Sequence, residues 1–174
     1  NIITVLTLVT IDFAAIVAAL IIAITIRNYL LKLLLPQIGS SVNLSTYLSF
    51  WWFILFWFGA YTTSGLYTRR LPFWNETKRL WVSISISILI TLTIVSLGHL
   101  TDQFSRATLV FSWLLLIPLA PLARLGVKKA LFRLNIWRKK LLIIGAGETG
   151  KLALKTLNGN VNLGYEVIGF VDDD

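Results

Sequence analysis

The chain has 174 residues, of which 56% are hydrophobic and only 14% are charged, and it contains no cysteine. Soluble domains carry about 25% charged residues, so this composition predicts a membrane protein, and the lack of cysteine excludes disulfide and thiolate chemistry. The net charge of +8 does not indicate a nucleic-acid partner, because most basic residues lie just outside the apolar runs, where lipid headgroups would meet them.

Four apolar segments are each close to the roughly 20 residues that a helix needs to cross a bilayer. We predict spans at about residues 3–26, 45–63, 80–100 and 107–127. Together they form an all-α four-helix transmembrane domain over residues 1–138. The third span begins with alternating Ser and aliphatic residues, but an isolated strand leaves its backbone groups unsatisfied in lipid. We therefore expect a helix in which Ser83 and Ser87 form a small-residue packing face.

The basic residues predict the orientation of this multi-pass chain. Lys and Arg are most frequent between the second and third spans and after the fourth, at Arg69, Arg70, Lys78, Arg79 and within residues 124–140. The positive-inside rule then places both termini in the cytoplasm. The first span is too long and too evenly apolar for a cleaved signal peptide. Because the chain lacks methionine and stops directly after a predicted strand that needs neighbours, we expect both of its ends to be cut.

One acidic residue, Asp12, lies inside a predicted span, where a carboxylate is costly and usually has a partner. Arg124, near the end of the fourth span, would lie at a similar depth in the bilayer. We predict an Asp12–Arg124 pair that holds the first and fourth spans together. A proton or ion pathway is the alternative, which the lack of a companion acid or histidine in the other spans disfavours.

The pattern changes at Lys139, from which we predict the first β-α-β half of a Rossmann-like α/β domain over residues 139–174. A short apolar strand leads into the sequence Gly-Ala-Gly-Glu-Thr-Gly at residues 145–150 and then into a helical stretch. A second strand follows at Tyr165–Val171, and an acidic residue comes after it. This order is that of the Rossmann fingerprint.

The fingerprint predicts a nucleotide site. Gly145, Gly147 and Gly150 would let the backbone approach a pyrophosphate at the helix N-terminus, and Asp172 would bind a ribose hydroxyl. A Rossmann-like scaffold that binds no nucleotide is the alternative, and the sequence leaves the two open. No catalytic residue and no metal site is predicted in the chain.

Three stretches of the sequence resemble the N-terminal region of the large bacterial polyprenyl glycosylphosphotransferases. These are the undecaprenyl-phosphate sugar phosphotransferases that start exopolysaccharide, capsule and O-antigen synthesis. The stretches are GLYTRRLPFW at Gly65–Trp74, PLAR at Pro121–Arg124, and LIIGAGETG with LGYEVIGFVDDD within Leu142–Asp174. We interpret residues 72–79 of the first stretch as a short interfacial helix beside the membrane.

The resemblance implies a protein of the bacterial inner membrane in which four helices precede a Rossmann-like domain, often labelled CoA-binding. In that family a C-terminal domain transfers a sugar 1-phosphate from a UDP-sugar to undecaprenyl phosphate, using Mg²⁺ and an Asp–Glu pair. That domain is not in this sequence, so we expect these residues alone to be inactive. The implied partners are membrane lipid, undecaprenyl phosphate and a UDP-sugar, and a homo-oligomer is left open.

Two other functions are compatible with the pattern. The membrane-bound, NAD-dependent nucleotide-sugar epimerases and dehydratases look similar through the same four helices and glycine motif. The Pro72-Phe73-Trp74 loop looks more like that of the phosphotransferases. The third hypothesis is a non-catalytic membrane module that senses a nucleotide through the Rossmann half and dimerises through its helices.

Overall fold

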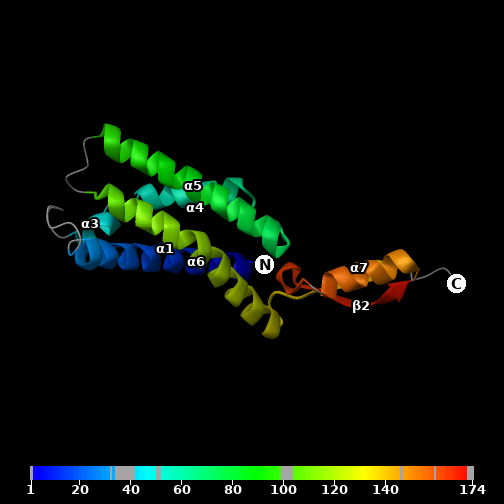
Figure 1. The fold of residues 1–174 in the computed structure, drawn as a ribbon. Helices are drawn as coiled ribbons and strands as arrows, with labels where there is room; N and C mark the ends of the chain where they lie inside the picture. The colour runs from blue at the N-terminus through cyan, green and yellow to red at the C-terminus, as the bar shows by residue number, and fades with distance from the viewer. Residues whose placement is uncertain are drawn as a thin grey trace.

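The structure, a computed structural model, describes residues 2–31, 33, 42–49, 52–98, 104–145, 147–158 and 160–171. The first part holds α1 (Ile2–Thr25), which runs into the π-helix η1 (Ile26–Leu31), then α3 (Leu44–Ser49), α4 (Trp52–Thr63), α5 (Phe73–Leu97) and α6 (Arg106–Arg133). The second part holds β1 (Lys139–Ile144), α7 (Glu148–Asn158), the 3-10 helix η3 (Val161–Leu163) and β2 (Tyr165–Val171). Figure 1 shows the long helices packed together, with the strand–helix–strand unit beyond one end of them.

Among the described residues, three helices are long and apolar enough to cross a membrane, at Ile2–Leu30, Phe73–Leu97 and Arg106–Arg133. They account for the first, third and fourth predicted spans, and the chain is a membrane protein. The second predicted span, 45–63, holds the shorter helices α3 and α4, and Phe50 and Trp51 between them lie outside the described residues. The fourth crossing, and with it the division of the chain at residue 138, stays a prediction.

The third predicted span begins earlier than the sequence indicates. α5 starts at Phe73 rather than Leu80, directly after Pro72, whose φ of −56° and ψ of 151° are not helical. The separate interfacial helix expected for residues 72–79 is therefore wrong, because these residues open one continuous helix of 25 residues. The physical reason is that Glu76 and Thr77 are buried against the protein, so these polar residues do not interrupt the helix.

The central helix of the bundle is α6, which packs against both α1 and α5, while α4 packs against α5. The face that α1 buries is rich in small residues, with Ala15, Ala19 and Ala23 all buried. Small side chains let helix backbones approach closely, which lipid-embedded helices use in place of a hydrophobic driving force. α6 continues past the predicted end at residue 127, since Lys128 is buried too.

The predicted small-residue face of α5 is confirmed. Ser83 and Ser87 are both buried, and both lie against the preceding helix. The Ser83 hydroxyl is 2.7 Å from the Ser64 hydroxyl, and the Ser87 hydroxyl donates to the Phe56 carbonyl at 3.3 Å. The alternation of serine and isoleucine is thus a packing pattern between helices and not a strand.

The second part of the chain has the predicted strand–helix–strand order. β1 and β2 pair in parallel, from Lys139 opposite Tyr165 to Ile144 opposite Val171, with an irregularity between Leu141 and Leu142. α7 packs against both strands. We call β1, α7, η3 and β2 together the half-sheet unit.

Candidate functional site

The glycine motif forms a tight turn between β1 and α7. Gly145 has a φ of +92°, a left-handed conformation that side chains rarely adopt. A Cβ atom at Gly150 would collide with the Gly145 carbonyl oxygen, so the first turn of α7 lies directly against the end of β1. A Cβ atom at Gly147 would meet no atom within 4 Å. The first and third glycines of the motif are therefore required by the turn, while the second faces open space.

One feature of this turn suits a phosphate, but its charge does not favour an anion. Open space at Gly147 beside the start of α7 suits a phosphate, since the free N–H groups of a helix N-terminus bind anions. Glu148 places a carboxylate in that same first turn. Asp172, the predicted ribose ligand, lies outside the described residues. The residues fit a nucleotide phosphate in shape only, and the predicted site stays a prediction.

A second candidate site is a cluster of buried charges where the helices meet the half-sheet unit. The predicted pair is confirmed: Arg124 Nε and Nη2 donate to the two carboxylate oxygens of Asp12, at 2.8 and 2.5 Å. Both side chains are almost fully buried, at 1% exposure. Tyr67 donates its hydroxyl to Asp12 at 2.8 Å, so the carboxylate has three donors.

The cluster extends beyond the predicted pair. Arg124 Nη1 also donates to Glu76 Oε1 at 3.0 Å, and Lys128 Nζ lies 2.7 Å from both oxygens of Glu76. Asn162 Nδ2 donates to Glu76 Oε2 at 2.7 Å. Two carboxylates thus face two cations, and Asn162 links the half-sheet unit to this balanced set.

Sequence reasoning missed Glu76, Lys128 and Asn162. Glu76 was assigned to a surface helix, and Lys128 to the charges that meet headgroups. One signal was available: Lys128 follows Arg124 by four residues, so the two cations share one face of α6. Two cations on a face that already carries a buried Arg124–Asp12 pair require a second acid. Nothing in the sequence pattern indicated Asn162.

Arg70 makes the second link between the helices and the half-sheet unit. Its Nη1 atom lies 2.9 Å from each of three carbonyl oxygens, those of Trp137, Leu163 and Gly164. Its guanidinium also stacks on the Trp137 ring, 4.2 Å from the centroid. Burial lowers the pKa of Arg70, and the nearby Tyr165 opposes that shift. The residue holds together the connection after α6 and the start of β2.

The turn before β2 needs a glycine because it packs against Trp137, the residue on which Arg70 stacks. Gly164 has a φ of +65°, and a Cβ atom there would collide with the Trp137 ring. Trp137 donates its Nε1 proton to the Asn162 carbonyl at 3.1 Å. The turn before β2 is therefore shaped to fit the tryptophan that ends the connection from α6.

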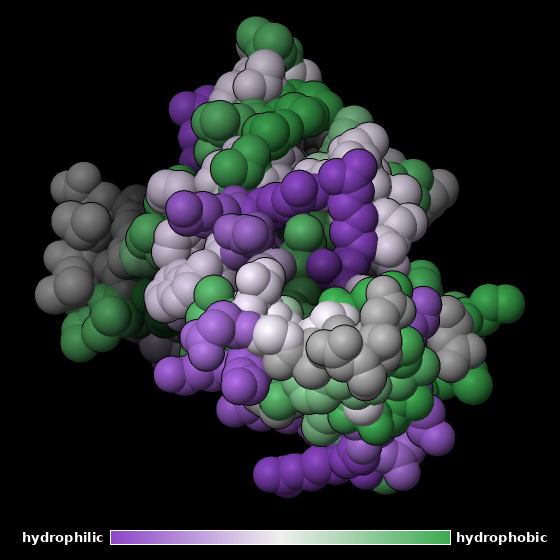
Figure 2. Space-filling model, turned by 90° about the vertical axis from the view of Figure 1, so that its right-hand side faces the viewer, coloured by the Kyte–Doolittle hydropathy of each residue, from purple (hydrophilic) through white to green (hydrophobic). Residues whose placement is uncertain are grey.

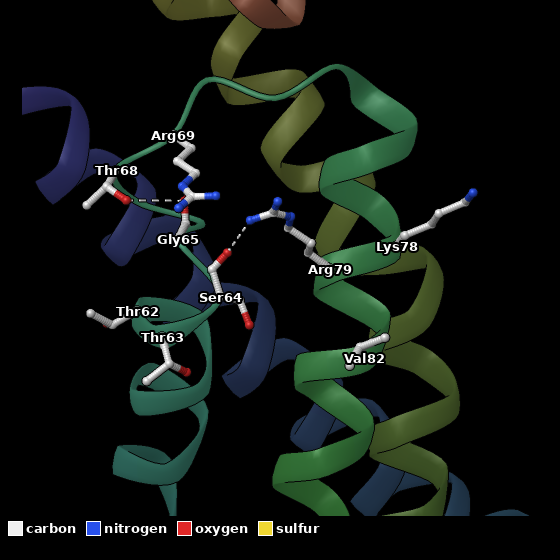
Figure 3. A pocket seen from close by; sticks show the side chains of 9 residues that line it. All are labelled: Thr62, Thr63, Ser64, Gly65, Thr68, Arg69, Lys78, Arg79 and Val82. Atoms are coloured by element: carbon white, nitrogen blue, oxygen red, sulfur yellow. Dashed lines mark hydrogen bonds between the residues drawn. The ribbon is translucent and has the colours of Figure 1, made fainter.

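A basic cavity of about 520 Å³ opens beside the turn between α4 and α5. Its lining includes Arg69, Lys78 and Arg79 together with the hydroxyl residues Thr62, Thr63, Ser64 and Thr68. Figure 3 shows Arg79 reaching across the opening, where it donates to the Ser64 carbonyl at 2.8 Å. Figure 2, a view from the end that carries the half-sheet unit, shows hydrophilic surface around a hollow. We call the cavity lined by Arg69, Lys78 and Arg79 the basic pocket.

No group of three or more His, Cys, Asp or Glu residues that could hold a metal ion occurs in the described part of the chain. The basic pocket is lined only by neutral and basic residues among those described. The arrangements that the structure does provide are therefore a buried ionic junction, a glycine turn and an anion-attracting cavity.

Comparison with known proteins agrees with the resemblance stated from the sequence. The chain is 36% identical over 108 residues to an undecaprenyl-phosphate galactose phosphotransferase of Salmonella typhimurium, a match that covers 62% of this chain and 22% of that protein. It is 34% identical, with the same coverage, to a UDP-galactose-lipid carrier transferase of Erwinia amylovora. A sugar transferase of Haemophilus influenzae is 32% identical over 105 residues, 60% of this chain and 22% of that protein.

The chain spans about a fifth of the length of these curated relatives. The resemblance to the sugar phosphotransferases is confirmed, because these relatives are sugar transferases. Residues 56–174, which are more than half of the chain, match the family described as a CoA-binding domain. This protein therefore belongs to the family described as a CoA-binding domain.

Proposed function

We propose that this chain is the membrane anchor and accessory domain of a sugar transferase. The transferase moves a sugar 1-phosphate from a UDP-sugar to undecaprenyl phosphate in bacterial polysaccharide biosynthesis, with catalysis and its Mg²⁺ in a domain outside these residues. The names of two relatives support the acceptor and the donor. The protein lies in the bacterial inner membrane with both termini in the cytoplasm.

The observation that carries the anchoring role is the double link between the helices and the half-sheet unit. Arg70 binds three carbonyl groups of the unit and its connection, and Glu76 binds Asn162. The Glu76 link is buried and the Arg70 link is partly buried, and both use directional hydrogen bonds to a charged group. They therefore fix the orientation of the half-sheet unit relative to the helices as well as its distance from them. A polyprenyl acceptor is dissolved in the bilayer. Holding the active site of the full protein against the membrane therefore raises the local concentration of the acceptor at that site.

The test uses the full protein that contains this chain. Transfer of radiolabelled sugar phosphate from UDP-galactose to undecaprenyl phosphate is measured in membranes and with a short-chain, water-soluble polyprenyl phosphate. Arg70→Ala should lower transfer to the membrane acceptor several-fold and leave transfer to the soluble acceptor unchanged. Lys129→Ala, which removes an exposed cation of α6, is the matched control and should change neither.

Two results would contradict the proposal. Transfer of sugar phosphate by residues 1–174 alone would place catalysis in this chain. Failure of the full protein to use any UDP-sugar would remove the transferase assignment itself.

A nucleotide at the glycine turn is a separate part of the proposal. When bound, it would supply a phosphate group to the N-terminus of α7, held by the backbone of Gly145, Gly147 and Gly150. Calorimetry of the full protein with coenzyme A and NAD tests this directly, and Gly147→Leu, which fills the open space, should abolish binding. If neither compound binds to the unsubstituted protein, the half-sheet unit is a scaffold.

A further inference from the structure

Two cavities of opposite character adjoin between α4 and α5. The basic pocket lies at the end of the helices nearer the half-sheet unit, and an apolar groove of about 340 Å³ runs along the two helices. Thr63 and Ser64 line both of them, so the two cavities adjoin. From this arrangement we propose that the α4–α5 hairpin binds a lipid with a phosphate headgroup, with its phosphate in the basic pocket and a hydrocarbon tail in the groove.

The basic pocket has free cationic capacity for a phosphate. Among the described residues, no carboxylate lies within 4 Å of Arg69 or Lys78, and both side chains are exposed. The Arg79 guanidinium is fixed by its bond to the Ser64 carbonyl, yet it keeps further N–H donors because a guanidinium has five. Arginine donors in a fixed fork are well matched to phosphate oxygens.

Three hydroxyl groups of the pocket are already hydrogen-bonded within the protein, so they are not the donors that an anion would use. Thr62 and Thr63 donate to carbonyl groups one turn back in α4, at 2.8 and 3.0 Å. Ser64 is engaged with Ser83 at 2.7 Å. The recognition of an anion therefore falls to Arg69 and Arg79, with Lys78 at the rim.

The groove has the character and position expected for a lipid tail. Its walls include Leu55 of α4 with Ile86 and Ile90 of α5, all three exposed on helices that are apolar enough for the bilayer or close to it. Gly59 keeps the groove open, since a Cβ atom there would meet nothing within 4 Å. A free phosphate would need only the basic pocket, whereas the adjoining apolar groove favours an amphiphile.

The position of the basic pocket agrees with a headgroup. It lies where α4 ends and α5 begins, and lysine and arginine side chains at the end of a membrane helix are attracted to anionic headgroups. The proposed ligand is bound by the helices themselves, so this proposal does not depend on which reaction the full protein performs.

Photolabelling of the intact protein tests the site. The protein is reconstituted in phosphatidylcholine nanodiscs with phosphatidic acid that carries a diazirine in its acyl chain, and labelled peptides are mapped by mass spectrometry. We expect labels in α4 and the first half of α5, displaced by excess phosphatidic acid but not by phosphatidylcholine. Arg69→Gln with Lys78→Gln should lower this labelling several-fold, and Gly59→Leu should abolish it.

Matched variants separate the site from general lipid contact. Gly126→Leu adds the same side chain at an open helical position of α6, and Lys129→Gln with Arg133→Gln removes two cations elsewhere. Neither control should change the labelling. Equal labelling by a phosphatidylcholine probe, or equal loss in the controls, would overturn the proposal in favour of ordinary surrounding lipid. Displacement by inorganic phosphate with no effect of Gly59→Leu would overturn it in favour of a free-anion pocket.

Discussion

At the scale of single residues, the buried cluster at the junction holds two carboxylates against two cations, with Asp12 and Glu76 facing Arg124 and Lys128. A buried carboxylate is tolerated only when it is paired and hydrogen-bonded. Asp12 receives two donors from Arg124 and one from Tyr67. Burial raises the pKa of the Tyr67 phenol, and the Asp12 carboxylate raises it further, so Tyr67 keeps the proton that it donates. This closed arrangement supports a structural role for Asp12.

The first prediction concerns this pairing. Asp12→Asn should lower the free energy of unfolding by about 3 kcal/mol, because it leaves part of the buried Arg124 charge without its partner. Unfolding by SDS in mixed micelles measures the change, and Thr10→Val, at an exposed position of the same helix, should have little effect. Unchanged stability together with loss of activity in the full protein would contradict the structural role and favour a functional acid.

The second prediction concerns the glycine turn. Gly150→Ala should open the contact between α7 and β1, since the new Cβ atom would collide with the Gly145 carbonyl oxygen. Overpacking of this kind costs about 1–3 kcal/mol, and amide hydrogen exchange in β1 and β2 should accelerate accordingly. Gly147→Ala is the control, because its Cβ atom has open space. Equal exchange rates in the two variants would show that the third glycine is not needed for packing.

At the scale of elements, the sequence predicted what depends on local pattern. The strands, the glycine turn and the helix between them follow from apolar runs separated by glycines, and the structure has them in that order. The start of α5 was missed, because Glu76 and Lys78 look like the edge of a bilayer when read locally. Glu76 is instead paired with Lys128, 52 residues away in the chain, and accepts a hydrogen bond from Asn162, 86 residues away. Such distant partners leave no periodic signal.

The third prediction belongs to the contact between α4 and α5. Ser87 is fully buried, and its hydroxyl lies against the Phe56 carbonyl, so the interface has no room for a larger side chain. Ser87→Leu should destabilise the bundle by about 1–3 kcal/mol through overpacking. Thr93→Leu, at an exposed position of the same helix, is the control and should be neutral in the same SDS unfolding assay. Equal stability of both variants would show that small residues do not set this contact.

At the scale of the whole molecule, the start of α1 and the half-sheet unit lie at the same end of the bundle. Figure 1 shows the N-terminus beside the connection to that unit. Thr4 and Leu8 of α1 line one cavity together with Trp137 and Lys139. An even number of crossings brings both termini to one side of the membrane. This proximity therefore supports the second predicted span, residues 45–63, as the fourth crossing. The shorter length of α4 alone would not suggest that crossing.

The last prediction tests that topology. The chain has no cysteine, so single cysteines report position without background. Thr68→Cys, Lys140→Cys and Arg106→Cys replace exposed residues at the α4–α5 turn, in β1 and at the start of α6. In intact spheroplasts, a membrane-impermeant maleimide should modify Arg106→Cys and spare the other two, because the positive-inside rule places the arginine-rich turn and the half-sheet unit in the cytoplasm. Modification of Thr68→Cys but not Lys140→Cys would put the turn and the unit on opposite sides, which is incompatible with the contacts of Arg70.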